Sequence, residues 1–76
     1  MTITDKIQRI LIDNKACRKD DFILYAKYIT KYHPELKHIE LVEAFKNHKK
    51  YGLPSFKTIT RTRQYVQVRY PDLKGE

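Results

Sequence analysis

Cross-linking and metal-binding residues are scarce in this sequence. The chain has 76 residues with one cysteine, Cys17, and no tryptophan. A single cysteine excludes a disulfide within the chain and a site of several thiolates, so we expect a protein of a reducing compartment that is stabilised by packing. Without a histidine on the same element, Cys17 is expected to be a small semi-buried residue and not a nucleophile. His33, His38 and His48 lack the close spacing of a metal-binding motif, and we expect no metal site.

Long apolar runs are also absent. No stretch approaches the roughly 18 apolar residues that span a bilayer, and the first residues lack the pattern of a secretory signal, so we expect a cytoplasmic protein without a membrane span. A chain of this size buries only about 60% of the surface that its unfolded form exposes, which leaves little room for a catalytic cleft. Because no phosphate loop, nucleophile motif or pair of catalytic carboxylates is present, we predict neither an enzyme nor a cofactor.

Acidic residues are missing from one long stretch. The sequence carries 16 Lys and Arg against 9 Asp and Glu, a net charge of +7. Residues 1–45 are nearly balanced, whereas residues 46–69 carry seven basic side chains and no acidic one, so the positive excess lies in this segment. Such a block attracts phosphate or an acidic protein if it lies on one surface. The simpler interpretation is a solvated basic face that keeps a small protein in solution.

The apolar residues that are present recur at helical spacing in four segments. We predict helices at about 3–13, 20–33, 36–50 and 55–69. Thr2 and Asp5 are spaced as a capping pair for the first helix, and a carboxylate at Asp20 or Asp21 can accept the free amides that begin the second. Pro34 stops the second helix. The pattern predicts one all-α domain, a small bundle of three to four helices.

The clearest break lies between the third and fourth segments. Gly52 suits the left-handed conformation that closes a helix, and Pro54 cannot continue one. Ser55 is placed to cap the fourth helix, and Pro71 ends it. Residues 65–70 are rich in β-branched and aromatic side chains and are also compatible with a strand, but the cap and the stop favour a helix.

A helix, a short turn with glycine and a second helix with a polar outer face form the arrangement of a helix-turn-helix, which we predict for the C-terminal pair. Lys57 and Arg61 can neutralise phosphates or reach guanine, Gln64 can pair with adenine, and Thr58 can bond phosphate or contact thymine. A second set is predicted to hold the DNA backbone and consists of Lys46, Lys49, Lys50 and Arg69. The three lysines equally complement the dipole of the third helix.

The helical spacing also predicts where Arg63 and the tyrosines lie. Arg63 points toward the apolar side of the fourth helix, where we expect it to pair with a carboxylate such as Glu40 or Glu43. Of the six tyrosines, most are expected to fill the core, and Tyr28 and Tyr65 are the candidates for an exposed surface.

Two blocks of the sequence carry a resemblance. Residues 18–25 read Arg-x-Asp-Asp-x-x-Leu-Tyr, and residues 54–63 read Pro-Ser-Phe-x-Thr-Ile-x-Arg-x-Arg. Over about two-thirds of its length the chain resembles small, mostly uncharacterised proteins encoded by phages and prophages of Gram-positive bacteria. The resemblance implies a mobile-element origin and a helix-turn-helix-like fold, and it brings no catalytic residue. An Ala-Arg pair is common in that group at the positions of Thr62 and Arg63.

Two hypotheses of different classes follow. The first is a phage or prophage protein that binds double-stranded DNA through the helix at 55–69 in a regulatory role such as transcription control, with a homodimer or a partner supplying specificity. The second is a protein-interaction module that docks its basic helix on a host or phage protein to inhibit or recruit it. Tyr65 and Val68, beside the charged residues, favour the second.

Overall fold

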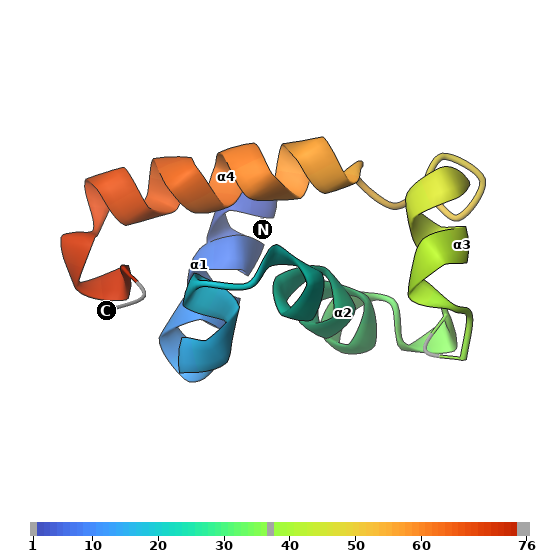
Figure 1. Ribbon diagram of the computed structural model, residues 1–76, viewed down its shortest axis with the longest axis horizontal. Coiled ribbons are helices and arrows are strands. Elements are labelled where there is room, and N and C mark those ends of the chain that lie inside the picture. Colours follow the sequence, from blue (N-terminus) through green and yellow to red (C-terminus); the bar gives the residue numbers. More distant parts are fainter. Residues whose placement is uncertain (1, 37, 75–76) are drawn as a thin grey trace.

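Within residues 2–36 and 38–74, which the computed structural model describes, the chain forms four α-helices and three short 3-10 turns (Figure 1). The helices are α1 (Ile3–Asp13), α2 (Asp21–Tyr32), α3 (Leu41–Lys46) and α4 (Phe56–Arg69). The 3-10 turns are Lys15–Arg18, Pro34–Leu36 and Pro71–Leu73. The predicted all-α class is confirmed, since these described residues contain no strand.

Hydrogen bonds at the caps explain where α1, α2 and α4 begin. Thr2 Oγ1 accepts from the Asp5 N–H and the Asp5 carboxylate accepts from the Thr2 N–H, both at 3.2 Å, which completes the predicted capping box of α1. Asp20 caps α2 by accepting two first-turn amides, and Ser55 caps α4 by accepting one at 3.1 Å. Because α4 continues to Arg69, the helical interpretation of its last turns is confirmed and the strand alternative is wrong.

The predicted third helix at 36–50 is wrong in extent. Leu36 is the last residue of a 3-10 turn, residue 37 lies outside the described residues, and residues 38–40 are not helical. The helix α3 itself has only six residues, and residues 47–52 form hydrogen-bonded turns. In these turns the amides of Lys50 and Tyr51 bond to carbonyls three residues back and not four. The apolar spacing continues through the turns because Leu36 and Ile39 pack against the same core as the helical residues. Periodicity alone therefore extends the helix too far.

The connection from α3 to α4 ends in a closed and anchored turn. Gly52 has a φ of +70°, and the Leu53 N–H donates to the His48 carbonyl at 2.8 Å, the pattern of a Schellman motif. Leu53 is buried. The hydroxyl of the fully buried Tyr25 donates to the Pro54 carbonyl at 2.7 Å, which ties this connection to α2.

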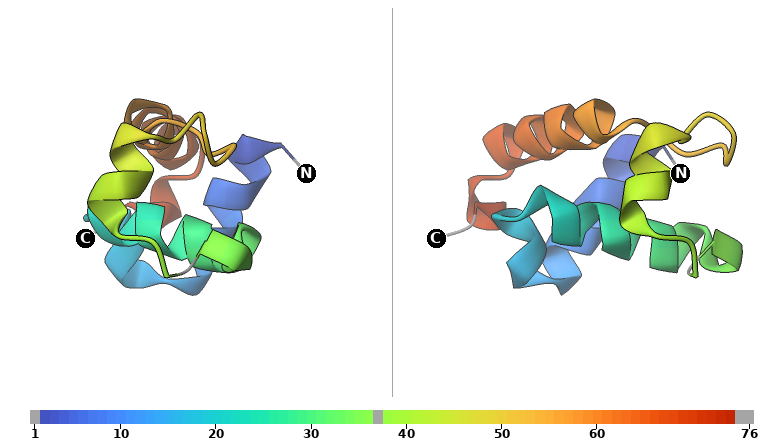
Figure 2. Two further views of the ribbon diagram at one scale, coloured as in Figure 1. Left: turned by 90° about the vertical axis from the view of Figure 1, so that its right-hand side faces the viewer. Right: turned by 45° about the vertical axis from the view of Figure 1, so that its right-hand side comes forward.

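The core lies between α1, α2 and α4, with α4 lying across the other two (Figure 1). Its buried apolar residues are Ile7, Ile10, Leu11, Cys17, Leu24, Tyr25, Tyr28, Ile29, Ala44, Leu53, Ile59, Val66 and Leu73. Figure 2 shows α3 at one end of this three-helix core. The helix that precedes α4 in sequence is therefore not the one on which α4 mainly packs. Their contact is at their ends, where the rings of Phe45 and Phe56 lie 4.8 Å apart.

An ion pair joins α2 to α4. Arg63 Nε and Nη2 donate to the two carboxylate oxygens of Asp21 at 2.5 and 3.3 Å, and the two side chains are only 18% and 19% exposed. The Thr60 hydroxyl donates to the same carboxylate at 3.1 Å. The predicted inward direction of Arg63 is confirmed. The expected partners Glu40 and Glu43 are wrong, because α2 and not α3 lies beside this part of α4.

Gln67 extends this ion pair into a network. Arg63 Nη1 donates to Gln67 Oε1 at 2.8 Å, and Gln67 Nε2 donates to the carbonyls of Arg18 and Leu73 at 2.9 and 3.0 Å. Arg18 Nε in turn donates to the Leu11 carbonyl at 2.7 Å, near the end of α1. One chain of hydrogen bonds thus connects α1, α2, α4 and the last turn.

Replacing Asp21 with Ala is expected to lower the free energy of unfolding by about 2–3 kcal/mol, because Arg63 then loses its carboxylate in a mostly dry site. The control is Asp13→Ala, which breaks an ion pair with Lys31 whose side chains are 50% and 41% exposed, and it should cost less than about 0.5 kcal/mol. Urea unfolding, monitored by circular dichroism, measures the free energy of unfolding of both variants. Equal losses would show that the Asp21 pair contributes no more than a surface pair.

Two valines on α4 test its register. Val66 is fully buried and Val68 is 78% exposed. Val66→Asp should abolish cooperative folding because it buries an unpaired charge, whereas Val68→Asp should keep the helical circular dichroism and shift the melting temperature by only about 3 °C or less. A folded Val66→Asp variant would show that this side of α4 does not face the core.

Candidate nucleic-acid interface

Three sides of α4 differ in their surroundings. Ile59 and Val66 face the core. One flank carries Arg63 and Gln67 and is bonded to α2, and the other flank lies over α1. In Figures 1 and 2 no other drawn helix covers the remaining outer side. We call this surface the outer side of α4.

The residues predicted to contact bases are all exposed on or beside the outer side. Lys57, Arg61 and Gln64 follow one another by four and three residues, so they fall within about 60° around the helix. Val68 lies in the same stripe. Thr58 is exposed as well, but its hydroxyl shares a 2.9 Å hydrogen bond with the Ser55 hydroxyl at the cap. The structure thus brings three of the four predicted side chains together and holds the fourth at the start of the helix.

The residues predicted to hold the backbone lie at both ends of α4. Lys46, Lys49 and Lys50 are exposed at the end of α3 and in the turns that follow, near the start of α4 (Figure 1). Arg69 is exposed at the other end. It comes twelve residues after Lys57, which corresponds to about 18 Å along the helix. The predicted set is therefore spread along the molecule and is not a single cluster.

The chain segment that forms most of this surface carries charge of one sign. Residues 46–69 contain no acidic side chain, and of their seven basic residues Arg63 is neutralised by Asp21. The other six are exposed: Lys46, Lys49, Lys50, Lys57, Arg61 and Arg69. A surface of this kind has a positive local potential that attracts a polyanion.

Arg69 has a hydrogen-bonded position that the sequence did not predict. Its Nη1 donates to the hydroxyl of Tyr65 at 3.3 Å, and the side chain lies beside Tyr70. The Tyr70 and Tyr65 phenols raise the pKa of Arg69 above its ordinary value. Arg69 is thus an exposed cation next to two hydroxyl groups.

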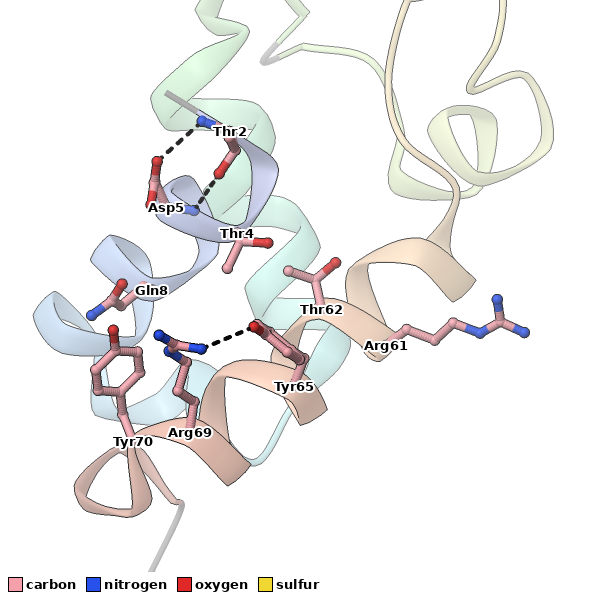
Figure 3. Close-up of a pocket in the computed structure, with 9 residues that line it drawn as sticks. All are labelled: Thr2, Thr4, Asp5, Gln8, Arg61, Thr62, Tyr65, Arg69 and Tyr70. Carbon is pink, nitrogen blue, oxygen red and sulfur yellow. Dashed lines mark hydrogen bonds between the residues drawn. The ribbon is translucent and has the colours of Figure 1, made fainter.

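A groove between α1 and the flank of α4 was also missed by the sequence reasoning (Figure 3). Its volume is about 680 Å³, and Thr4 and Gln8 line it from α1. Thr4 and Gln8 are four residues apart and so lie on one face of α1. This spacing is the feature of the sequence that could have indicated a polar face on α1. The groove itself depends on how α1 crosses α4, which no local pattern reports.

The tyrosine predictions are half correct. Tyr65 is 53% exposed, as expected. Tyr28 is 4% exposed, so its expected exposure is wrong. The centroid of the Tyr28 ring lies 5.4 Å from that of Tyr32 and 6.0 Å from the Lys6 amine on α1. Packing of α1 against α2 buries a wider face of α2 than the apolar stripe indicates.

Cys17 is fully buried as part of the core, whereas the sequence predicted a semi-buried residue. Desolvation raises the pKa of its thiol above the ordinary value, and the charge of Lys27 opposes this only in part. Because a raised pKa lowers the thiolate fraction near neutral pH, the residue is unsuited to be a nucleophile.

Ellman's reagent is expected to react with Cys17 in the folded protein at least about 100-fold more slowly than in urea at about pH 8, because reaction requires an opening of the core. The rate in the folded state should rise as the pH increases toward the raised pKa. A folded-state rate close to that in urea would show that the thiol is accessible.

Within residues 2–36 and 38–74, no three or more His, Cys, Asp and Glu side chains are grouped so that they could hold a metal ion. In the same part no helix combines the length and the apolar character needed to cross a membrane. Comparisons with protein-family models, curated proteins and solved structures found no match to this chain. The candidate interface therefore rests on the geometry of the chain itself.

Proposed function

We propose that this protein binds double-stranded DNA through the outer side of α4. The observation that carries the proposal is the stripe of Lys57, Arg61 and Gln64, which is exposed on a helix held to α1 and α2 by its opposite side. With Val68 the stripe extends over about three turns, roughly 16 Å. A helix of this kind fits the major groove of B-DNA, which is about 12 Å wide.

Each residue of the stripe has a role that its chemistry supports. Lys57 and Arg61 bind phosphates or the O6 and N7 atoms of guanine, and Gln64 pairs with the edge of adenine. Val68, at the far end of the stripe, suits apolar contact with a thymine methyl group. The exposed lysines before α4 bind the phosphate backbone at its start, and Arg69 binds it at its end.

The number of cations sets the expected dependence on salt. If four to six phosphates are neutralised, the slope of log K against log salt is about −4 to −5. A single copy of so small a chain makes few base contacts, so sequence preference requires a homodimer on two half-sites or a partner protein. The resemblance to phage and prophage proteins agrees with a regulatory role on the DNA of a mobile element.

A protein-interaction module is the second candidate. Val68 and Tyr65 are 78% and 53% exposed on the same helix as the cations. An apolar and an aromatic side chain beside positive charges suit an acidic protein surface with an apolar depression. Binding of this kind would not require duplex DNA.

The double variant Lys57→Ala with Arg61→Ala tests the outer side. Because both side chains are exposed, the melting temperature should stay nearly unchanged, while binding to random-sequence duplex DNA weakens and the salt slope falls in magnitude by about 2. Fluorescence anisotropy at about 50 and 200 mM salt measures the slope, and selection from a random pool then reports sequence preference.

The matched control removes two exposed lysines that lie outside residues 46–69, Lys19→Ala with Lys27→Ala. Its slope should remain close to that of the unmodified protein. If both double variants lose the same DNA affinity, the protein attracts DNA only through its overall positive charge. If the Lys57 and Arg61 double variant binds DNA as tightly as the unmodified protein, α4 is not the interface. If the unmodified protein does not bind duplex DNA even at low salt, the protein-interaction module is the better interpretation.

A further inference from the structure

The groove between α1 and α4 lies directly beside the outer side of α4 (Figure 3). Arg61, Tyr65 and Arg69 follow one another at intervals of four residues, along the edge where the outer side meets the groove. In Figure 3 the side chain of Arg61 turns away from the groove, whereas the guanidinium of Arg69 turns into it beside the Tyr65 hydroxyl. The groove is thus continuous with the surface proposed to meet DNA.

Hydrogen-bond donors line the groove from two helices. Arg69 supplies a cation from α4, Gln8 supplies an amide from α1, and Thr4, Tyr65 and Tyr70 supply hydroxyl groups. In Figure 3 the polar ends of Gln8, Arg69 and Tyr70 face the same space. Guanidinium, amide and hydroxyl groups are the side chains that contact phosphate and sugar oxygens without reading bases.

The acidic member of the groove is Asp5. Its carboxylate accepts the Thr2 N–H at 3.2 Å in the capping box of α1. The positive end of the α1 dipole offsets part of its charge there. One carboxylate oxygen of Asp5 is therefore used in starting α1, and Asp5 and Arg69 line the groove as charges of opposite sign.

We propose that the α1–α4 groove binds the sugar-phosphate backbone of the DNA strand that borders the major groove occupied by α4. Gln8 and Arg69 bind the phosphate oxygens from the two helices, and the tyrosine hydroxyls contact the sugar or the next phosphate. This inference rests on the proposed function. It adds α1 to the DNA-binding surface and determines which flank of α4 faces that strand.

A charge series at Gln8 tests the groove. Gln8→Lys should tighten binding to duplex DNA and steepen the salt slope by about 0.9, and Gln8→Glu should weaken binding and flatten the slope by a similar amount. One phosphate contact corresponds to an additional loss of affinity of about 3.5-fold between 50 and 200 mM salt, which is readily measured. Lys and Glu both favour helices, so α1 is expected to fold in both variants.

The matched control places the same charges at Thr30, an exposed position on α2 outside the groove. Thr30→Lys and Thr30→Glu measure the long-range effect of one charge on DNA binding. We expect each to change the slope of log K against log salt by less than half the change that the same charge causes at Gln8. Circular dichroism and melting temperature verify the fold of each variant. If a Gln8 variant fails to fold, the same two charges at Thr4, on the same wall, give the second series.

The outcomes separate this inference from the function on which it rests. If the unmodified protein binds DNA and loses binding on removal of Lys57 and Arg61, but the Gln8 series matches the Thr30 series, the groove is not a backbone site and the role of α4 stands. If the unmodified protein does not bind duplex DNA at about 50 mM salt, both proposals are overturned. Opposite changes for Gln8→Lys and Gln8→Glu, larger than those at Thr30, support the groove.

Discussion

The position of α4 depends on one carboxylate. Asp20 and Asp21 are neighbours with separate duties, since Asp20 accepts the first amides of its own helix and Asp21 accepts from Arg63 and Thr60 of α4. Taking a carboxylate and a guanidinium out of water is costly unless both are well bonded, and here two donors of Arg63 and one hydroxyl satisfy Asp21. Because these donors lie on one flank of α4, the pair acts together with the buried Ile59 and Val66 to set the rotation of the helix.

That rotation divides the basic segment into two parts. Arg63 is removed from the surface and neutralised, while the other six cations of residues 46–69 remain exposed. Six like charges on a small domain repel one another, and a bound polyanion relieves that repulsion. The same arrangement that costs some stability in the free protein therefore favours binding of a phosphate-rich partner. The groove over α1 is on the flank of α4 opposite Asp21, so it stays open.

Local signals in the sequence were sufficient for α1, α2 and α4, because capping side chains and prolines act within a few residues. The third segment was not predictable in this way, since Leu36 and Ile39 reach the core from a 3-10 turn and a bend as readily as from a helix. The exposed stripe of the candidate site followed from helical spacing. The partner of Arg63 did not, because Asp21 is 42 residues away in sequence and only the packing of α2 against α4 brings the two together. The groove was missed for the same reason.

The anchored connection before α4 has a consequence for the entropy of binding. Its backbone is held by the left-handed Gly52, by the Schellman hydrogen bonds and by the Tyr25 hydroxyl on the Pro54 carbonyl. Lys49 and Lys50 are therefore carried on a backbone whose conformational freedom is already lost when the chain folds. Contact with a ligand then restricts their side chains alone, so these two cations contribute to association without the ordering cost of a loop that folds on binding.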